Sequence, residues 1–388
     1  MGAAANLLRR AAALLDPADP DRLRISWELA QSLVEAGAIA EAREVATASV
    51  DLARAAGDET AEGYATCALW IARVVSDPQL DVDAWGSDAD RLIELFDRLD
   101  DRRGSALAWA QKAIVLWFRE RLAECAEASE RAVENAIASG ETYIASDMRG
   151  HFLAATGLGP RPFAERRPLL ESTLRDAVAR GDRRLEQATL QGFAMEAAFQ
   201  GHFDEARTNA ELARQIKQEL GLTLDYWANA MGLGRIEWMA GDLDAATAVL
   251  REACEALEAL GETAYLSTAA ALLAHFELEL GDRAAAERWT DVARRTASSG
   301  DRSSQVAIAQ MDGLLAAHAG ADGWPHFRRA LELVDENDSP IWRSEVRIVT
   351  ARALTSTHFD VAARLAREAL QIAEAKGATV YADWARQL

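Results

Sequence analysis

A short motif that returns at a fixed step is the feature of this sequence that most constrains its fold. The residues GHFDEA begin at Gly201, GDLDAA begin at Gly241 and GDRAAA begin at Gly281, so that each copy starts 40 residues after the previous one. The related segment GAIAEA begins at Gly37. Self-similarity at such a period is typical of repeat proteins, in which each unit packs only on its neighbours.

A second series of turn residues lies between these motifs, and most of its members are followed by Asp, Glu or another polar residue. Glycine ends a helix in the left-handed conformation, and a following Asp, Ser or Thr caps the next helix. Each repeat therefore holds two helices, and the chain holds about nine helix pairs. The series consists of Gly57, Asp100, Gly140, Gly181, Gly221, Gly261, Gly300, Asp338 and Gly377.

The composition agrees with a helical array that has one continuous core. Hydrophobic residues make up 50% of the 388 residues, and only eight residues are proline. We expect a single domain over 1–388, with a lead-in helix at 1–15, nine helix pairs over 16–377 and a final helix at 378–388. The least regular segments, 77–87 and 157–168, are expected to be lengthened turns.

The motifs resemble the tetratricopeptide repeat. Gly201, Phe203 and Ala206 match the second half of that family's pattern, and Gly234 stands at its helix-A glycine. The resemblance implies an all-α, right-handed superhelical solenoid, although the period is longer than the family's 34 residues. The longer helices also look like the repeat regions of large bacterial signalling regulators of the ATPase/cyclase or LuxR type.

Charge and motifs exclude several function classes. The net charge of −20 disfavours nucleic acid or an anionic membrane as the partner. None of the three lysines, Lys112, Lys217 and Lys376, is followed by Ser or Thr, so a Walker A loop is absent from the sequence. No spacing suits a catalytic group, a metal site or a cofactor, so we expect a binding protein that is not an enzyme.

The sequence also predicts the cellular compartment of the protein. Cys67, Cys125 and Cys254 are scattered and odd in number, which indicates a reducing environment. Arg9 and Arg10 interrupt the apolar N-terminal run, so it does not read as a signal peptide. We therefore expect a cytoplasmic protein.

The family resemblance also indicates which residues line the concave groove. Four positions of each first helix face that groove in the family, and in this sequence they carry no Asp or Glu. A groove without carboxylates would suit an anionic ligand, although Arg235 would alternatively pair with Glu237 or Glu279. The candidate binding residues are Arg149, Gln191, Met195, Arg235, Trp238, His275, Gln310 and Arg347.

Two functions remain open at this stage. The first is a binding or sensing array of a bacterial signalling or transcriptional regulator, whose groove takes a protein, a peptide or an elongated small ligand. The second is a structural array that self-associates or docks an upstream ATPase or cyclase module. A ligand site should gather polar and aromatic groups in consecutive repeats, whereas a packing surface should be uniformly apolar.

Overall fold

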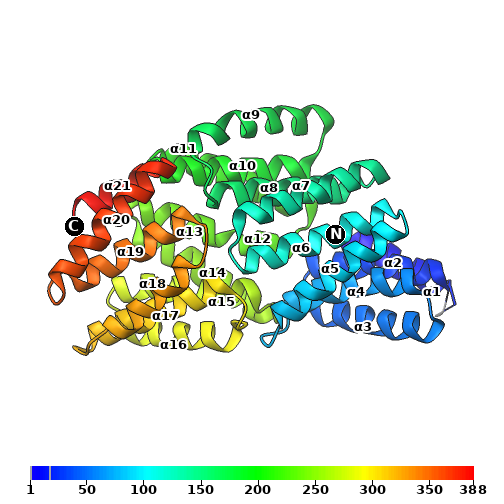
Figure 1. The fold of residues 1–388 in the computed structure, drawn as a ribbon, viewed down its shortest axis with the longest axis horizontal. Coiled ribbons are helices and arrows are strands. Elements are labelled where there is room, and N and C mark those ends of the chain that lie inside the picture. The colour runs from blue at the N-terminus through cyan, green and yellow to red at the C-terminus, as the bar shows by residue number, and fades with distance from the viewer. Residues whose placement is uncertain (1, 17–18) are drawn as a thin grey trace.

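The computed structural model describes residues 2–16 and 19–388, and within these residues the only regular elements are the helices α1 to α21 (Figure 1). The helices follow one another as antiparallel pairs. This arrangement confirms the all-α repeat solenoid expected from the 40-residue period.

The first helices of the pairs are α2 (Pro20–Glu35), α4 (Glu59–Val74), α6 (Arg102–Phe118), α8 (Thr142–Leu158), α10 (Arg183–Phe199), α12 (Thr223–Ala228) with α13 (Ala230–Ala240), α15 (Ala264–Glu279), α17 (Arg302–His318) and α19 (Pro340–Leu354). The second helices are α3 (Ile39–Ala56), α5 (Val82–Arg98), α7 (Leu122–Ser139), α9 (Phe163–Arg180), α11 (Phe203–Leu220), α14 (Leu243–Leu260), α16 (Arg283–Thr296), α18 (Trp324–Asp335) and α20 (Phe359–Lys376). The terminal helices are α1 (Gly2–Ala13) and α21 (Thr379–Arg386).

Local signals set the helix ends as the sequence predicts. Gly241 ends α13 with a left-handed φ of 86°, and the Asp242 side chain then accepts a hydrogen bond from the Ala245 N–H at the start of α14. In the third repeat Glu120 takes the place of the glycine and also has a positive φ, of 52°. Each turn thus stops one helix and starts the next.

Both expected turns are shorter than predicted, since α5 already begins at Val82, inside the segment 77–87. Only residues 159–162 connect α8 to α9, and Pro168 lies inside α9. Leu170 is buried in that helix, and Arg166 forms a buried ion pair with Glu196 of α10 at 3.0 Å. Tertiary contacts of this kind outweigh the loss of one backbone hydrogen bond at the proline.

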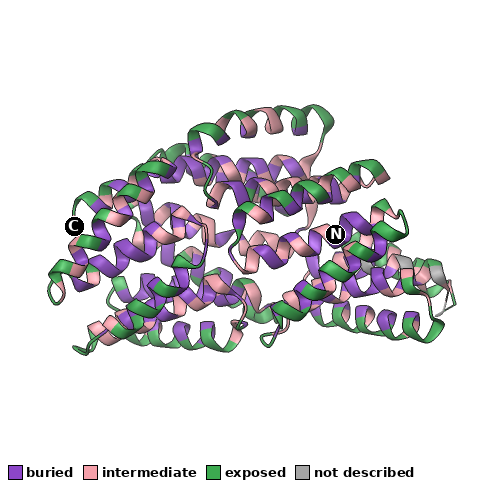
Figure 2. Cartoon of the chain, viewed as in Figure 1, coloured by how far each residue is buried: buried purple, intermediate pink, exposed green. Residues whose placement is uncertain are grey.

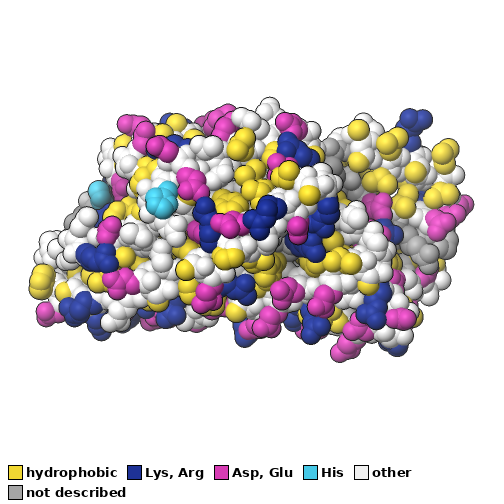
Figure 3. Space-filling model, turned by 90° about the horizontal axis from the view of Figure 1, so that it is seen from above, with side chains coloured by type: hydrophobic (Ala, Val, Ile, Leu, Met, Phe, Trp, Pro, Cys, Tyr) yellow, Lys and Arg dark blue, Asp and Glu magenta, His cyan; other side chains and the backbone are white. Residues whose placement is uncertain are grey.

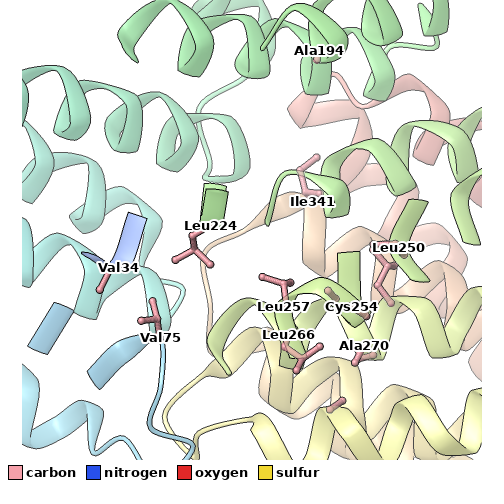
Figure 4. Packing of buried hydrophobic residues seen from close by; sticks show 14 of the residues in the cluster. Val34, Val75, Ala194, Leu224, Leu250, Cys254, Leu257, Leu266, Ala270 and Ile341 are labelled. Atoms are coloured by element: carbon pink, nitrogen blue, oxygen red, sulfur yellow. The ribbon is translucent and has the colours of Figure 1, made fainter. Parts of the chain in front are cut away.

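The repeats wind so tightly that helices far apart in the sequence share one core. Figure 2 shows buried residues on the inward side of most helices and exposed residues on their outward side. α2 contacts α12, and α10 contacts α21. Figure 4 shows Val34 and Val75 of the first two repeats near Leu224 of the sixth, with Leu257 and Leu266 beyond. Hydrophobic packing therefore holds successive superhelical turns together as well as neighbouring repeats.

Polar contacts reinforce this closure along what we call the inter-turn seam, made of the contacts Val75–Thr263, Leu122–Asp338 and Gly159–Lys376. The Thr263 N–H donates to the Val75 carbonyl at 2.9 Å. The Asp338 carboxylate accepts from the Leu122 N–H at 2.7 Å and so caps α7. Since the three pairs are 188, 216 and 217 residues apart, one superhelical turn takes about five 40-residue repeats.

The last helix is covered by the array itself. Tyr381 is fully buried, and its ring centroid lies 5.4 Å from that of Phe199 on α10. The Trp384 ring lies 4.8 Å from the Trp238 ring on α13. The apolar face of α21 therefore packs on the preceding superhelical turn.

We expect replacement of Ala206 or Ala246 by leucine to lower the free energy of unfolding by about 1–3 kcal/mol. Both alanines are fully buried where a second helix begins to pack on its partner, so the added carbons have no space. Urea unfolding followed by circular dichroism measures the effect, with the exposed Ala284→Leu as the control. If both leucine variants at the buried positions were as stable as the wild type, the close packing at these turns would be contradicted.

A search of residues 2–16 and 19–388 finds no helix whose length and apolar content would let it cross a lipid bilayer.

Candidate ligand-binding site

Arg235, on α13, is a cross-link between opposite walls of the superhelix. It is 8% exposed and forms an ion pair with Glu345 of α19, 110 residues away. Its guanidinium also lies 4.3 Å from the ring centroid of Trp342, and the Tyr381 hydroxyl donates to the same carboxylate. The partner is therefore neither of the acids expected from the sequence, because the superhelix brings a distant repeat opposite α13.

Trp238 and His275 meet at a shared carboxylate. The Trp238 indole N–H donates to Glu279 at 3.2 Å, and the His275 Nε2 atom lies 3.1 Å from the other oxygen of Glu279. Trp238 and His275 are both largely buried, and their rings contact each other edge to face. The two predicted residues therefore lie together on the inner side of the sixth and seventh repeats.

Arg347 points away from the predicted groove. It forms ion pairs with Asp335 of α18 at 2.6 Å and with Glu368 of α20 at 3.0 Å, and both partners lie on second helices of pairs. On α19 it is Glu345 that reaches across the interior to Arg235. The predicted register is wrong for this repeat, and so is the expectation of an interior without carboxylates.

The other predicted residues lie along the middle of the array. Arg149 on α8 is half-buried and forms no hydrogen bond or ion pair with a described residue. Gln191 accepts a hydrogen bond from the Lys217 ammonium at 2.9 Å, and Met195 follows one helical turn later on α10. Gln310 is buried on α17. Gln191 and Met195 adjoin the cluster described next.

A cluster of polar side chains lies where α2 faces α8, α10 and α12, and we call it the polar hollow: Glu35, Tyr143, Asp147, Arg184, Asp225 and Asn229. Arg184 lies at its centre and forms ion pairs with Glu35 at 2.7 Å and with Asp147 at 2.6 Å. Its guanidinium lies 4.5 Å from the Tyr143 ring centroid, and the Tyr143 hydroxyl donates to Glu35. These contacts link the first repeat to the fourth and fifth.

Several polar atoms of the hollow have no partner. Asn229 lies between α12 and α13 and is 5% exposed, yet neither atom of its amide forms a hydrogen bond with a described residue. The Oε2 atom of Glu35 is also buried without a partner. Asp225 stands four residues before Asn229, on the same helical face, and its carboxylate forms no hydrogen bond with a described residue. Buried polar groups normally find partners, so the Asn229 amide and the Glu35 Oε2 atom mark places for a ligand or water, and the half-buried Asp225 carboxylate stands beside Asn229.

Burial shifts the pKa values of ionisable groups in and beside the hollow. Burial raises the pKa of Glu35 to about 7, against the opposing charge of Arg184. Burial also raises the pKa of Asp225. On the neighbouring α11, burial lowers the pKa of Lys217 to about 8, against the charge of Asp225. Three carboxyl groups therefore share the hollow with one guanidinium and one partly neutral lysine.

Gly232 leaves space at the edge of the hollow. A Cβ atom there would lie 3.0 Å from Gln191 Nε2, 3.3 Å from Met195 Sδ and 3.9 Å from Asn229 Oδ1. The absence of a side chain at Gly232 thus leaves the Gln191 and Asn229 amides facing the same space beside an apolar thioether. Amides that both donate and accept, with carboxylates nearby, can bind a peptide unit or a cationic group.

We expect the wild-type protein to lose stability relative to Glu35→Gln as the pH rises from 5 to 8.5. Because the folded-state pKa of Glu35 is raised above its unfolded value, its contribution is complete below about pH 4.5 and disappears as the pH passes about 7. Relative to Glu35→Gln, the wild type should lose on the order of 1–3 kcal/mol over this range. The unfolding midpoint at several pH values measures the difference, and the exposed Glu44→Gln is the control. If the unfolding midpoints of the wild type and Glu35→Gln changed with pH in the same way, the raised folded-state pKa of Glu35 would be contradicted.

Comparison with known proteins shows the fold. No protein-family profile matches the sequence, and no curated protein matches it. The structure is similar to a Rap protein complexed with Competence and Sporulation Factor, with a TM-score of 0.64, 11% identity, and coverage of 93% of this chain and 100% of that one. It is also similar to the APC/C hetero-tetramer Cut9–Hcn1, with a TM-score of 0.51, 14% identity, and coverage of 95% and 78%.

These solved structures are tetratricopeptide-type repeat proteins. The chain is a tetratricopeptide-like repeat array. In this array no group of three or more His, Cys, Asp or Glu side chains among the described residues is placed to hold a metal ion. The face seen from above in Figure 3 carries basic and acidic side chains side by side, so no broad area of one sign forms on that face.

The sequence reasoning missed most of the polar hollow. Glu35, Asp147 and Asp225 lie outside the four groove positions carried over from the family, and their meeting depends on how the array curves. One signal was available for Asn229. It lies in the segment 229–234, NAMGLG, whose two glycines weaken the helix where α12 ends and α13 begins.

Proposed function

We propose that this array binds a peptide segment in the polar hollow, as the sensing part of a bacterial signalling regulator. The observation that carries the proposal is the Asn229 side chain, which is almost fully buried and whose two amide atoms have no partner among the described residues. A peptide unit offers one N–H donor and one C=O acceptor, and the Asn amide offers the matching pair. A bound peptide backbone would therefore satisfy both atoms at once.

The surroundings of Asn229 support an extended ligand. Gln191 adds a second amide, and Met195 adds an adaptable apolar contact. Gly232, which has no side chain, leaves the space between them. The Rap protein to which this chain is similar was solved in complex with Competence and Sporulation Factor, so an array of this fold can hold a ligand.

The charge of the hollow bears on which peptides fit. Glu35, Asp147 and Asp225 outnumber Arg184 and Lys217, so the hollow suits a neutral or basic peptide better than the anionic ligand expected from the sequence. A basic side chain of the ligand would find its acceptor at Asp225, which has no hydrogen-bond partner among the described residues.

We also propose that the array acts by binding rather than by catalysis and that it works in the cytoplasm. Cys67, Cys125 and Cys254 are buried free thiols, which supports a reducing compartment. Burial raises the pKa of Cys67 and of Cys125, each to about 12, so these thiols are poor nucleophiles near neutral pH.

The proposal is tested by selection from a random peptide library displayed on phage, with the affinities of the enriched peptides measured by calorimetry. We expect Asn229→Ala to weaken binding about tenfold or more, the loss of roughly one well-made pair of hydrogen bonds. Asn209→Ala, on the outer helix α11, is the matched control. The absence of any enriched peptide would contradict the function, and equal binding by wild type and Asn229→Ala would exclude the polar hollow as the site.

A further inference from the structure

A pocket lies in the last third of the array, apart from the polar hollow. The pocket, of about 450 Å³, is formed by the C-terminal parts of α15, α17 and α19, the first helices of three consecutive repeats. Leu278, Leu314 and Val349 form its apolar wall. Its volume lies within the roughly 300–1,000 Å³ of small-molecule sites.

One side of this pocket is polar, and its carboxylate, Glu279, is already paired with other side chains. His275 and Trp238 occupy the two oxygens of Glu279, at 3.1 and 3.2 Å. Burial opposes ionisation of Glu279, but these contacts and the charge of Arg352 hold its pKa below the usual value. Glu279 is therefore a fixed, satisfied anion in the pocket wall.

The two remaining polar groups form no hydrogen bond with a described residue, although Arg352 forms a long ion pair with Glu279. Arg352 lies 4.0 Å from Glu279, its side chain is 47% exposed, and it forms no hydrogen bond with a described residue. Its guanidinium lies 5.6 Å from the Trp384 ring, which supports it from one side. His318 also lines the pocket and forms no hydrogen bond or ion pair with a described residue.

We propose that this pocket is a second binding site, which takes a small amphipathic monocarboxylate. The carboxylate binds the planar fork of Arg352, with His318 as a second donor. The apolar body of the ligand lies on Leu278, Leu314 and Val349, where it loses contact with water. Because Glu279 already places one negative charge in the wall, a monoanion fits better than a dianion such as a phosphate monoester.

Titration calorimetry with octanoate tests the site, with octylamine and octan-1-ol as probes that keep the same apolar chain. We expect octanoate to bind and the two other probes to bind at least about tenfold more weakly, because they lack the charge-assisted pairing with Arg352. Equal binding of octylamine, or no binding of octanoate at millimolar concentration, would overturn the proposal.

Three variants locate the binding on the protein. Arg352→Gln should weaken octanoate binding about tenfold, whereas Arg364→Gln, on the exposed face of α20, should leave it unchanged. Ala317→Phe fills the pocket without removing a charge and should abolish binding. Thermal unfolding shows that each variant is folded. Unchanged affinity in folded Arg352→Gln, or in folded Ala317→Phe, would show that octanoate binds elsewhere.

Discussion

Replacing Arg235 with alanine is expected to lower the free energy of unfolding by about 3–5 kcal/mol, the range for removing one partner of a buried ion pair. The substitution leaves the Glu345 carboxylate buried opposite α13 without its cation, beside the Tyr381 hydroxyl. It also removes the guanidinium from the Trp342 ring. The loss should be larger than for any exposed arginine, because water cannot replace the missing partner.

Urea unfolding followed by circular dichroism measures the Arg235 effect, and hydrogen exchange shows where the array opens, since repeat proteins can unfold in parts. Arg367→Ala, exposed on α20, is the control and should change stability by less than about 0.5 kcal/mol. The double variant Arg235→Met with Glu345→Gln removes both charges and should recover much of the loss. A single variant as stable as the control would mean that the two walls are not joined at Arg235.

Replacing Lys376 with methionine is expected to open the inter-turn seam at its C-terminal end. The Lys376 ammonium donates to the carbonyls of Gly159 and Arg161, each at 2.6 Å, and of Thr156 at 3.3 Å. It thereby caps the end of α8 from 217 residues away. Methionine keeps most of the side-chain volume and leaves these carbonyls unsatisfied, at a cost of about 2–4 kcal/mol.

Hydrogen exchange over residues 156–163 should become faster in Lys376→Met, and X-ray scattering should show a larger radius of gyration. Lys112→Met is the matched control, because Lys112 on α6 pairs with Asp90 of the neighbouring helix α5. Exchange at wild-type rates in both variants would show that apolar packing alone closes the superhelix. A local increase without a change in radius would limit the role of Lys376 to capping α8.

The repeat fold was predictable because its signals are local. The glycine that ends α13 and the aspartate that starts α14 act within one turn of the chain, so Gly241 and Asp242 can be recognised from the residues alone. The same holds for the 40-residue step and for the alanines that let helices approach. Pro168 is an exception, since buried neighbours on α9 and α10 hold a helix through a residue that normally ends one.

The candidate site was predictable only in part. Gln191 and Met195 were identified from the family register, and they adjoin the polar hollow. Arg347 was misplaced because the ninth repeat has no glycine at the turn that sets the register, and an error of one residue moves a side chain by about 100° around the helix. Arg235 was placed on the interior, but its partner Glu345 could not be inferred from the sequence.

By itself the sequence determined the helices, their pairing and the period, since each depends on residues a few positions apart. Only the tertiary structure decided that the superhelix closes on itself after about five repeats. The physical reason is that a small rotation per repeat accumulates along the array, and no single residue encodes the sum. The accumulated curvature brings Glu35 to Arg184 and Arg235 to Glu345 across the interior and brings Lys376 to Gly159 after one full turn. It also leaves the Asn229 amide buried without a partner among the described residues.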